Sequence, residues 1–417
     1  MRIEKRRTAG RDYGGMEAII MSNELTTDRR GFLKTVAAAS VAAEARFADK
    51  PLSAAGRKIK VGHIGCGNVA MNAYVPDIAA CPYIELVSTC DLIASRAEHI
   101  AKKHGIPNCY YNIDSMLAGA SFDLLVNTTA MPAHFEVNLA ALEAGRNVWS
   151  EKPMGLRLAE VKQLLEMAQR KGVQIWPAPT VVTSPQFRFM AETIVSGKLG
   201  KIYSAHATYG HEGKLWSRWF FQKGGGSLYD LGVYNVGTLT GLLGPAKSVV
   251  GMYGVSNPMR TVHPHDGPPG DVYVTSDDNT MLIIEHDNAV FSHIQTGYTY
   301  FSGRDDKDIS ATDYTIDFTG TDGLMHLVGY DWAPHGVDIT YRGQPNLKME
   351  RFCTDPGRYT WQYGASYIAE CMATGKKSLI TAEHGLHILE VMNAALQSQE
   401  TGRRVKVEST FKWPIIT

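Results

Sequence analysis

Short apolar runs and amphipathic segments alternate along residues 58–178. The segment 158–172 carries apolar residues at positions 158, 161, 164, 165 and 168, which is the spacing of one helix face. The segment 134–145 also predicts a helix, ending on a glycine. Buried strands are predicted at IELVSTCD, SFDLLVNTT, NVWSEKP and VQIWPAP. Strands that alternate with helices predict an α/β fold with a doubly wound parallel sheet that closes near residue 178.

Residues 179–417 show mainly segments in which apolar and polar positions alternate. Strands are predicted at KIYSAHATYGH, SVVGMYGV, DVYVTSDDNTMLIIEH, AVFSHIQTGYTY, DYTIDFTG and LMHLVGY. These segments predict a second domain of the α+β type with a large, mostly antiparallel open sheet. Two helices, near 359–374 and 382–401, should pack back on the body. Such a sheet offers a flat face, and we expect a homodimer or homotetramer to form through it.

The stretch KIKVGHIGCGNVA combines a strand, a glycine turn and the start of a helix. Gly65 makes the tight turn, and Gly67 lets the backbone approach a pyrophosphate at the helix N-terminus. Asn68 and Val69 open the helix and are expected to lie beside the same group. The stretch therefore predicts a dinucleotide-binding site.

The following predicted strand ends on Asp91, about 20 residues after the glycine turn, as a dinucleotide-binding fingerprint requires. A carboxylate at this position accepts hydrogen bonds from the ribose 2′-hydroxyl and repels a 2′-phosphate, which favours NAD over NADP. Arg96 follows closely, and an arginine can pair with the extra phosphate, so NADP stays an alternative. We predict an NAD(P)-binding Rossmann domain over residues 58–178 and a substrate-binding and oligomerisation domain over 179–417.

Composition narrows the class of partner. Lysine plus arginine and aspartate plus glutamate number 42 each, so net charge draws the chain neither to nucleic acid nor to an anionic membrane. No apolar run reaches the ~18 residues that span a bilayer. The six cysteines form no C-x-x-C pair, and we expect free thiols. The segment His263–Asp266 lies in a proline-rich loop, and we predict no metal site.

Residues 1–57 are expected to be a leader outside the fold. The stretch RRGFLK, Arg29–Lys34, is close to the twin-arginine export motif. An apolar run and a small-x-small cleavage site, Ala43-Glu44-Ala45, follow it in the order of an export signal. This order predicts export to the periplasm. The alternative is an amphipathic helix that happens to carry two arginines, and the protein would then stay in the cytoplasm.

Several motifs in one order resemble the Gfo/Idh/MocA oxidoreductases, which include glucose–fructose oxidoreductase and inositol dehydrogenase. They are the glycine turn, TTAMPAH, ALEAGRNVWSEKPM, SGKLGKI and GGGSLYDLGVY. The resemblance implies that Lys152 lies beside the nicotinamide and the substrate, and that Glu151 contacts the nicotinamide ribose. It also implies that Thr129 and His134 line the cofactor.

The stretch GGGSLYDLGVYNVGTLTGLLGP predicts a glycine loop followed by a helix over 228–243. Asp230 and Tyr234 are four residues apart and should share one face, on which Gly237 would leave room for a ligand. Many family members carry histidine where this chain has Tyr234, whereas the glucose–fructose oxidoreductase branch resembles this chain in using tyrosine. The alternative is a core tyrosine with a structural aspartate.

These residues suggest a mechanism. A free tyrosine has a pKa of about 10 and is a poor base near neutrality. We expect the Lys152 cation to lower the pKa of Tyr234, which would then accept a proton from a sugar hydroxyl while hydride leaves the same carbon. Asp230 would hold an adjacent hydroxyl. Weaker candidates for substrate contact are Arg188, His211 and Trp332.

An exported enzyme cannot draw on a cytoplasmic pool of NAD, so the cofactor must be tightly bound and reoxidised in place. We therefore predict an NAD(P)-dependent oxidoreductase acting on a small-molecule carbohydrate. The alternative is a redox-neutral, NAD-dependent glycoside hydrolase that oxidises its substrate transiently and eliminates the aglycone. A third hypothesis, a sugar-binding protein without catalysis, is disfavoured by the complete set of Lys152, Asp230 and Tyr234.

Overall fold

The computed structural model of the protein describes residues 57–264, 268–300 and 313–416. The predicted leader therefore lies outside the described residues, apart from Arg57. The first half of the described chain is a six-stranded parallel sheet with the order β3-β2-β1-β4-β5-β6, which confirms the predicted doubly wound fold. Its strands are β1 (Ile59–Ile64), β2 (Ile84–Cys90), β3 (Asn108–Tyr110), β4 (Leu124–Asn127), β5 (Asn147–Ser150) and β6 (Ile175–Pro177).

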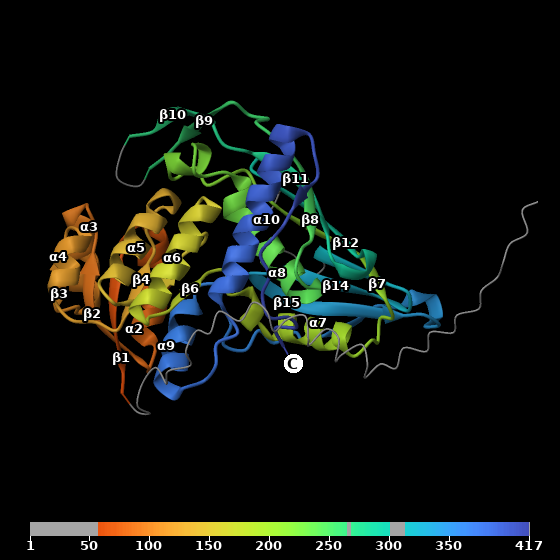
Figure 1. Ribbon diagram of the computed structural model, residues 1–417, viewed down its shortest axis with the longest axis horizontal. Coiled ribbons are helices and arrows are strands. Elements are labelled where there is room, and N and C mark those ends of the chain that lie inside the picture. The colour runs from red at the N-terminus through yellow and green to blue at the C-terminus, as the bar shows by residue number, and fades with distance from the viewer. Residues whose placement is uncertain (1–56, 265–267, 301–312, 417) are drawn as a thin grey trace, which may run out of the picture. The chain divides into compact units, whose positions relative to one another are not determined.

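Helices connect these strands and cover both faces of the sheet. Right-handed crossovers place α2 and α3 on one face and α4, α5 and α6 on the other, where α5 and α6 lie side by side (Figure 1). Helix α6 begins where the Glu160 carboxylate accepts the Arg157 N–H at 3.0 Å, and it ends at Gly172, which has φ +68°. The helices are α2 (Val75–Ala80), α3 (Ala94–His104), α4 (Ile113–Ala118), α5 (His134–Glu143) and α6 (Leu158–Lys171).

The second half contains a nine-stranded sheet with the order β16-β15-β14-β13-β7-β12-β11-β8-β17. All neighbouring pairs in it are antiparallel except β7 and β12, which confirms the predicted mostly antiparallel sheet. Its strands are β7 (Ile202–Gly210), β8 (Ser248–Gly254), β11 (Asn279–Glu285), β12 (Phe291–Gly297), β13 (Tyr314–Gly320), β14 (Gly323–Tyr330), β15 (Ala333–Tyr341), β16 (Glu350–Phe352) and β17 (Val405–Lys406). Strands β9 (Met259–Val262) and β10 (Gly270–Tyr273) form a separate hairpin.

Two π-helical turns and four further α-helices, besides short 3₁₀ turns, make up the other helical segments of the described chain. The turn η2 (Ala70–Tyr74) leads into α2, and the turn η6 (Leu228–Gly232) leads into α8 (Val233–Leu243). Helix α10 (Ala382–Thr401) packs against α8 and β8 and also against α6, so it joins the two halves (Figure 1). Helix α9 (Gly364–Thr374) returns to the first sheet beside α2, and α7 (Pro185–Val195) packs on α8 and β15.

The six cysteines are free, as predicted. Within the described ranges, no helix has both the length and the apolar character needed to cross a membrane.

Candidate active site

The glycine turn packs closely against the end of β4. Gly65 has φ +94°, and its N–H donates to the Cys90 carbonyl at 2.9 Å. A Cβ on Gly65 would lie 2.5 Å from the backbone nitrogen of Thr129, so only glycine fits there. A Cβ on Gly67 would meet no atom within 4 Å, which leaves this stretch of backbone open to a ligand. The turn therefore fits the predicted pyrophosphate.

Asp91 fixes the glycine turn from the end of β2. Its Oδ2 accepts the Cys66 N–H at 2.6 Å, and its Oδ1 accepts the Ile93 N–H at 2.8 Å. A carboxylate can accept about four hydrogen bonds, so Asp91 can also receive a ribose hydroxyl. Leu92, which sequence reasoning did not single out, is 85% exposed and places apolar surface next to this carboxylate.

The remaining cofactor candidates of this region lie in the first turns of two helices. Asn68 and Val69 are half-buried directly after the glycine turn, and Asn68 Oδ1 accepts a hydrogen bond from Asn72 Nδ2 at 2.6 Å. Arg96 is half-buried in the first turn of α3, directly after the strand end that carries Asp91.

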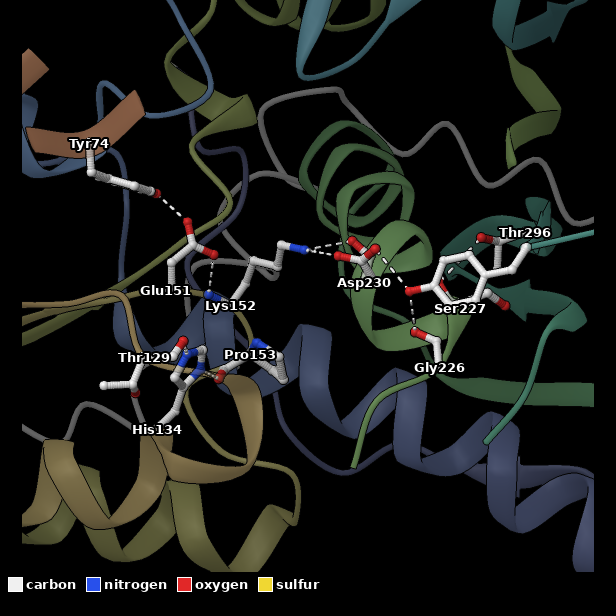
Figure 2. A network of polar contacts seen from close by, with 11 residues as sticks. Tyr74, Thr129, His134, Glu151, Lys152, Pro153, Gly226, Ser227, Asp230 and Thr296 are labelled. Carbon is white, nitrogen blue, oxygen red and sulfur yellow. Dashed lines mark hydrogen bonds and ion pairs between the residues drawn. The ribbon is translucent and has the colours of Figure 1, made fainter. Parts of the chain in front are cut away.

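Glu151 and Lys152 follow β5 and are buried, with 9% and 8% of their surfaces exposed. Glu151 Oε1 accepts a hydrogen bond from the Tyr74 hydroxyl, and Oε2 accepts the Lys152 N–H at 3.0 Å (Figure 2). Tyr74 is fully buried and ends the π turn η2. Sequence reasoning missed Tyr74 because 77 residues separate it from Glu151, and no spacing signals such a pair.

Lys152 extends away from Glu151 toward the π turn η6 (Figure 2). Its Nζ donates to the backbone carbonyl and to Oδ1 of Asp230, at 2.7 Å each. Asp230 Oδ2 accepts the hydroxyl of Tyr298, a fully buried residue that sequence reasoning also missed, at 2.9 Å. Burial opposes ionisation of Asp230, but the Lys152 ammonium outweighs it, and the pKa of Asp230 is lowered. The two residues form a buried ion pair.

A remote carboxylate holds the start of the helix that carries Asp230. Asp277 Oδ2 accepts the Ser227 hydroxyl at 2.6 Å and the Leu228 N–H at 2.8 Å, and so caps the first turn. A Cβ on Gly226, which has φ +104°, would lie 2.1 Å from Oδ1 of Asp277. The glycine loop thus allows the backbone to approach this cap.

From Leu228 to Leu242 every residue is buried except Tyr234, which is half-buried. The Lys152 Nζ lies over its ring, 5.0 Å from the ring centre. Burial, followed by the carboxylates of Glu151 and Asp230, raises the pKa of Tyr234 well above its ordinary value. The predicted lowering of this pKa by Lys152 is therefore wrong, because burial disfavours the charged tyrosinate and the carboxylates of Glu151, Asp230 and Asp331 oppose the effect of Lys152.

His134 lies inside the protein rather than on the surface that the cofactor would touch. Only 1% of it is exposed, its Nδ1 lies 2.7 Å from the Pro153 carbonyl, and its Nε2 lies 2.9 Å from the Thr129 carbonyl (Figure 2). Burial lowers the pKa of His134, although the two backbone carbonyls favour its protonated ring. We therefore assign His134 a positioning role instead of the expected direct contact. Thr129 is half-buried beside Gly65.

Two of the three weaker candidates are linked to Tyr234 through the ring of Tyr209. The ring of His211 stacks on Tyr298 with centres 5.6 Å apart, and its Nδ1 accepts the Gly213 N–H at 2.9 Å. The ring of Trp332 stacks on Tyr330 at 5.5 Å and lies 6.1 Å from Tyr209, whose ring is 6.2 Å from that of Tyr234. His211 and Trp332 therefore belong to the aromatic surroundings of the site.

For two other candidates the structure shows an environment different from the one expected. Arg188 lies on the solvent face of α7, opposite the buried Phe187 and Met190; its side chain is 54% exposed and lies 4.0 Å from Glu192. Gly237 leaves no room for a ligand, because a Cβ there would lie 3.2 Å from Ile388 of α10. Its small size serves helix packing.

Comparisons with known proteins agree with this geometry. Residues 59–178 match the family model of the oxidoreductase family with an NAD-binding Rossmann fold, and residues 187–326 match that of the GFO/IDH/MocA C-terminal domain. The two matches together span more than half of the chain. Trans-1,2-dihydrobenzene-1,2-diol dehydrogenase from Bos taurus is 25% identical over 323 residues, which cover 72% of this chain and 86% of that protein.

Two of the solved structures that share the fold contain NADH and a second ligand. Levoglucosan dehydrogenase in complex with NADH and L-sorbose has a TM-score of 0.72 at 20% identity, covering 85% of this chain and 100% of that one. The WlbA dehydrogenase from Bordetella pertussis, in complex with NADH and UDP-GlcNAcA, has a TM-score of 0.68 at 18% identity, with 84% and 99% covered. Residues 59–178 are thus an NAD-binding Rossmann domain.

Proposed function

This chain belongs to the Gfo/Idh/MocA oxidoreductase family, and we propose that it interconverts a hydroxyl and a carbonyl group on a sugar or sugar derivative. The buried ion pair of Lys152 and Asp230 carries the proposal. It joins the end of the NAD-binding domain to the start of the helix that presents Tyr234. None of the relatives named above supports the redox-neutral hydrolase alternative.

Lys152 and Tyr234 have different roles in the proposed reaction. NAD, when bound, supplies the hydride acceptor. An ammonium has three donors, and Lys152 uses two on Asp230, so the third can hold the substrate oxygen. Because the pKa of Tyr234 is raised, its hydroxyl stays protonated near neutrality and suits proton donation to a carbonyl oxygen during reduction. In the oxidative direction the same oxygen receives the proton of the substrate hydroxyl, which requires a higher pH.

A panel of hydroxylated compounds tests the proposal. The purified protein with NAD is mixed with L-sorbose, levoglucosan, other sugars and a dihydrodiol, and nicotinamide absorbance is followed at pH 7 and pH 9. We expect reduction of NAD by at least one sugar, faster at pH 9. Tyr234→Phe should lower the rate by ~10² or more while the substrate still binds. No absorbance change with any member of the panel would reject the assignment.

We also propose that the cofactor is held through purification and carried out of the cytoplasm by a twin-arginine leader. The support is the order of the motif, the apolar run and the cleavage site in the sequence. Replacing Arg29 and Arg30 by lysine should keep the protein in the cytoplasm, and NAD released by denaturation should approach one equivalent per chain. Unchanged export of that variant would refute the leader.

A homodimer or homotetramer through the second sheet is proposed from its open face. Neighbouring strands β8, β11 and β12 place large apolar side chains there that are 43–70% exposed: Val250, Met252, Met281, Ile283 and Phe291. Apolar patches of this kind mark interfaces. Light scattering should give a molar mass that is a multiple of the chain mass, and Met252→Lys should lower the measured molar mass. A monomeric wild type would contradict the proposal.

A further inference from the structure

The turn between β14 and β15 carries a buried carboxylate that the mechanism above does not use. Asp331 is 3% exposed, and its Oδ2 accepts hydrogen bonds from Asn235 Nδ2 at 3.1 Å and from the Thr238 hydroxyl at 2.9 Å. The Tyr359 hydroxyl donates to its backbone carbonyl at 3.2 Å. Asp331 is thus tied to the helix that presents Tyr234.

Three buried polar atoms, two at this turn and one on the facing helix α8, have no hydrogen-bond partner in residues 57–264, 268–300 and 313–416. They are Oδ1 of Asp331, Oδ1 of Asn235 and Nε1 of Trp332. Buried polar atoms are nearly always paired, and each one left unpaired costs about 1–3 kcal/mol. Asp331 and Asn235 are hydrogen-bonded to each other through other atoms, and Trp332 directly follows Asp331 in the chain. A ligand that supplies the missing partners explains why the fold keeps them.

The position of these atoms connects them to Tyr234. Tyr234 and Thr238 are four residues apart on α8 and share a face, so Asp331 lies one helical turn beyond Tyr234, away from Asp230. Trp332 extends the aromatic group that reaches Tyr234 through Tyr209. Asp331 is also close enough to contribute to the raised pKa of Tyr234.

We infer that Asp331, with Asn235 and Trp332, forms a second hydroxyl-binding site for the substrate, next to the carbon that exchanges hydride. The site has two acceptors and one donor beside aromatic rings. A hydroxyl group both donates and accepts, so the arrangement suits a polyol with a hydroxyl on a neighbouring carbon. A substrate with a single hydroxyl would leave the carboxylate unpaired.

The electrostatics of Asp331 agree with this inference. Burial raises the pKa of Asp331 to about 6, although Thr238 and Asn235 donate to Oδ2 of the carboxylate. The groups that face it are neutral at pH 7: the amide, the hydroxyl, and the tyrosines Tyr234 and Tyr359. A bound hydroxyl would therefore be a further donor to an ionised carboxylate that lacks a cation.

Asp331→Asn tests the inference, which rests on the proposed function. The probes are levoglucosan, which has vicinal hydroxyls, and cyclohexanol, which has one; calorimetry on the NADH-loaded protein gives their Kd, and absorbance gives kcat and KM. We expect Asp331→Asn to raise the Kd and KM of levoglucosan by about tenfold or more, to lower kcat less than threefold, and to leave the weak binding of cyclohexanol unchanged.

The control is Asp338→Asn, which removes another buried carboxylate of the same hairpin that pairs with Arg351. It should destabilise the fold without changing the Kd of levoglucosan. If levoglucosan reduces NAD and its Kd is the same in wild type and Asp331→Asn, the inference fails and the proposed function stands. If the wild type binds none of the sugars of the panel, both fail. A structure with saturating levoglucosan that shows an ordered water only at Asp331 would also overturn the inference.

Discussion

Removing Asp230 should reveal how much the ion pair at the centre of the site matters for folding. The Lys152 side chain is only 10% exposed. In Asp230→Ala its ammonium loses the carboxylate and keeps only the backbone carbonyl of residue 230, at 2.7 Å. Breaking a buried ion pair from one side costs about 3–5 kcal/mol, because the other charge stays buried without compensation. Replacing both partners by apolar residues of similar volume is often neutral.

The assay is a double-mutant cycle by urea unfolding at pH 7. We expect Asp230→Ala to lower the free energy of unfolding by about 3–5 kcal/mol, and Asp230→Leu combined with Lys152→Met to recover most of the loss of Asp230→Leu alone. The exposed pair of Arg404 and Glu285, 3.2 Å apart, serves as the control, because its loss should cost less than about 1 kcal/mol. A loss below about 1 kcal/mol for Asp230→Ala, or additive effects of the two substitutions, would refute the reasoning.

Three further predictions follow from the same geometry. Tyr298→Phe removes the hydroxyl that donates to ionised Asp230 at 2.9 Å, so kcat/KM should fall and the acid limb of its pH profile should move to higher pH. The control Tyr359→Phe leaves Asp230 untouched and should not move that acid limb. Gly65→Ala should abolish NAD binding, measured by fluorescence titration, because its Cβ would lie 2.5 Å from a backbone atom. Acid should destabilise the fold, because burial lowers the pKa of four histidines to about 3 or 4. Below the unfolded value of about 6.5 the unfolded state binds more protons, and each histidine then lowers the free energy of unfolding by about 1.4 kcal/mol per pH unit. Urea unfolding at pH 7 and pH 5 measures this loss, and a free energy of unfolding that does not depend on pH would count against the prediction. These histidines are His63, His286, His384 and His387.

The sequence predicted those features that local patterns encode. The glycine turn, Asp91 at a strand end, Lys152 after a strand and the helix of Tyr234 each follow from periodicity or a motif, and the structure brings Lys152 and Asp230 together. The exposure of Arg188 was less visible in the sequence, because the apolar Phe187 and Phe189 flank it on both sides.

Other features depend on contacts between distant segments. Tyr74, Tyr298 and Asp331 lie 77, 68 and 96 residues from the side chains that they contact, and each looks like an ordinary core or turn residue in the sequence. The pKa of Tyr234 depends on which carboxylates surround its hydroxyl and where the Lys152 ammonium points. Side-chain spacing along one helix contains no information on either.

The π turns η2 and η6 have a consequence for protein engineering. Each holds five residues on a helix whose next turns are α-helical, and each delivers one partner of the Glu151–Lys152 segment. An α-helix turns about 100° per residue. Deleting one residue to regularise either helix would therefore swing Tyr74 or Asp230 to another side, although every remaining residue kept its identity. Loop grafts or chimeras with relatives should be cut outside these two helices, and an alignment gap inside either of them marks a change of active-site geometry rather than a neutral difference in length.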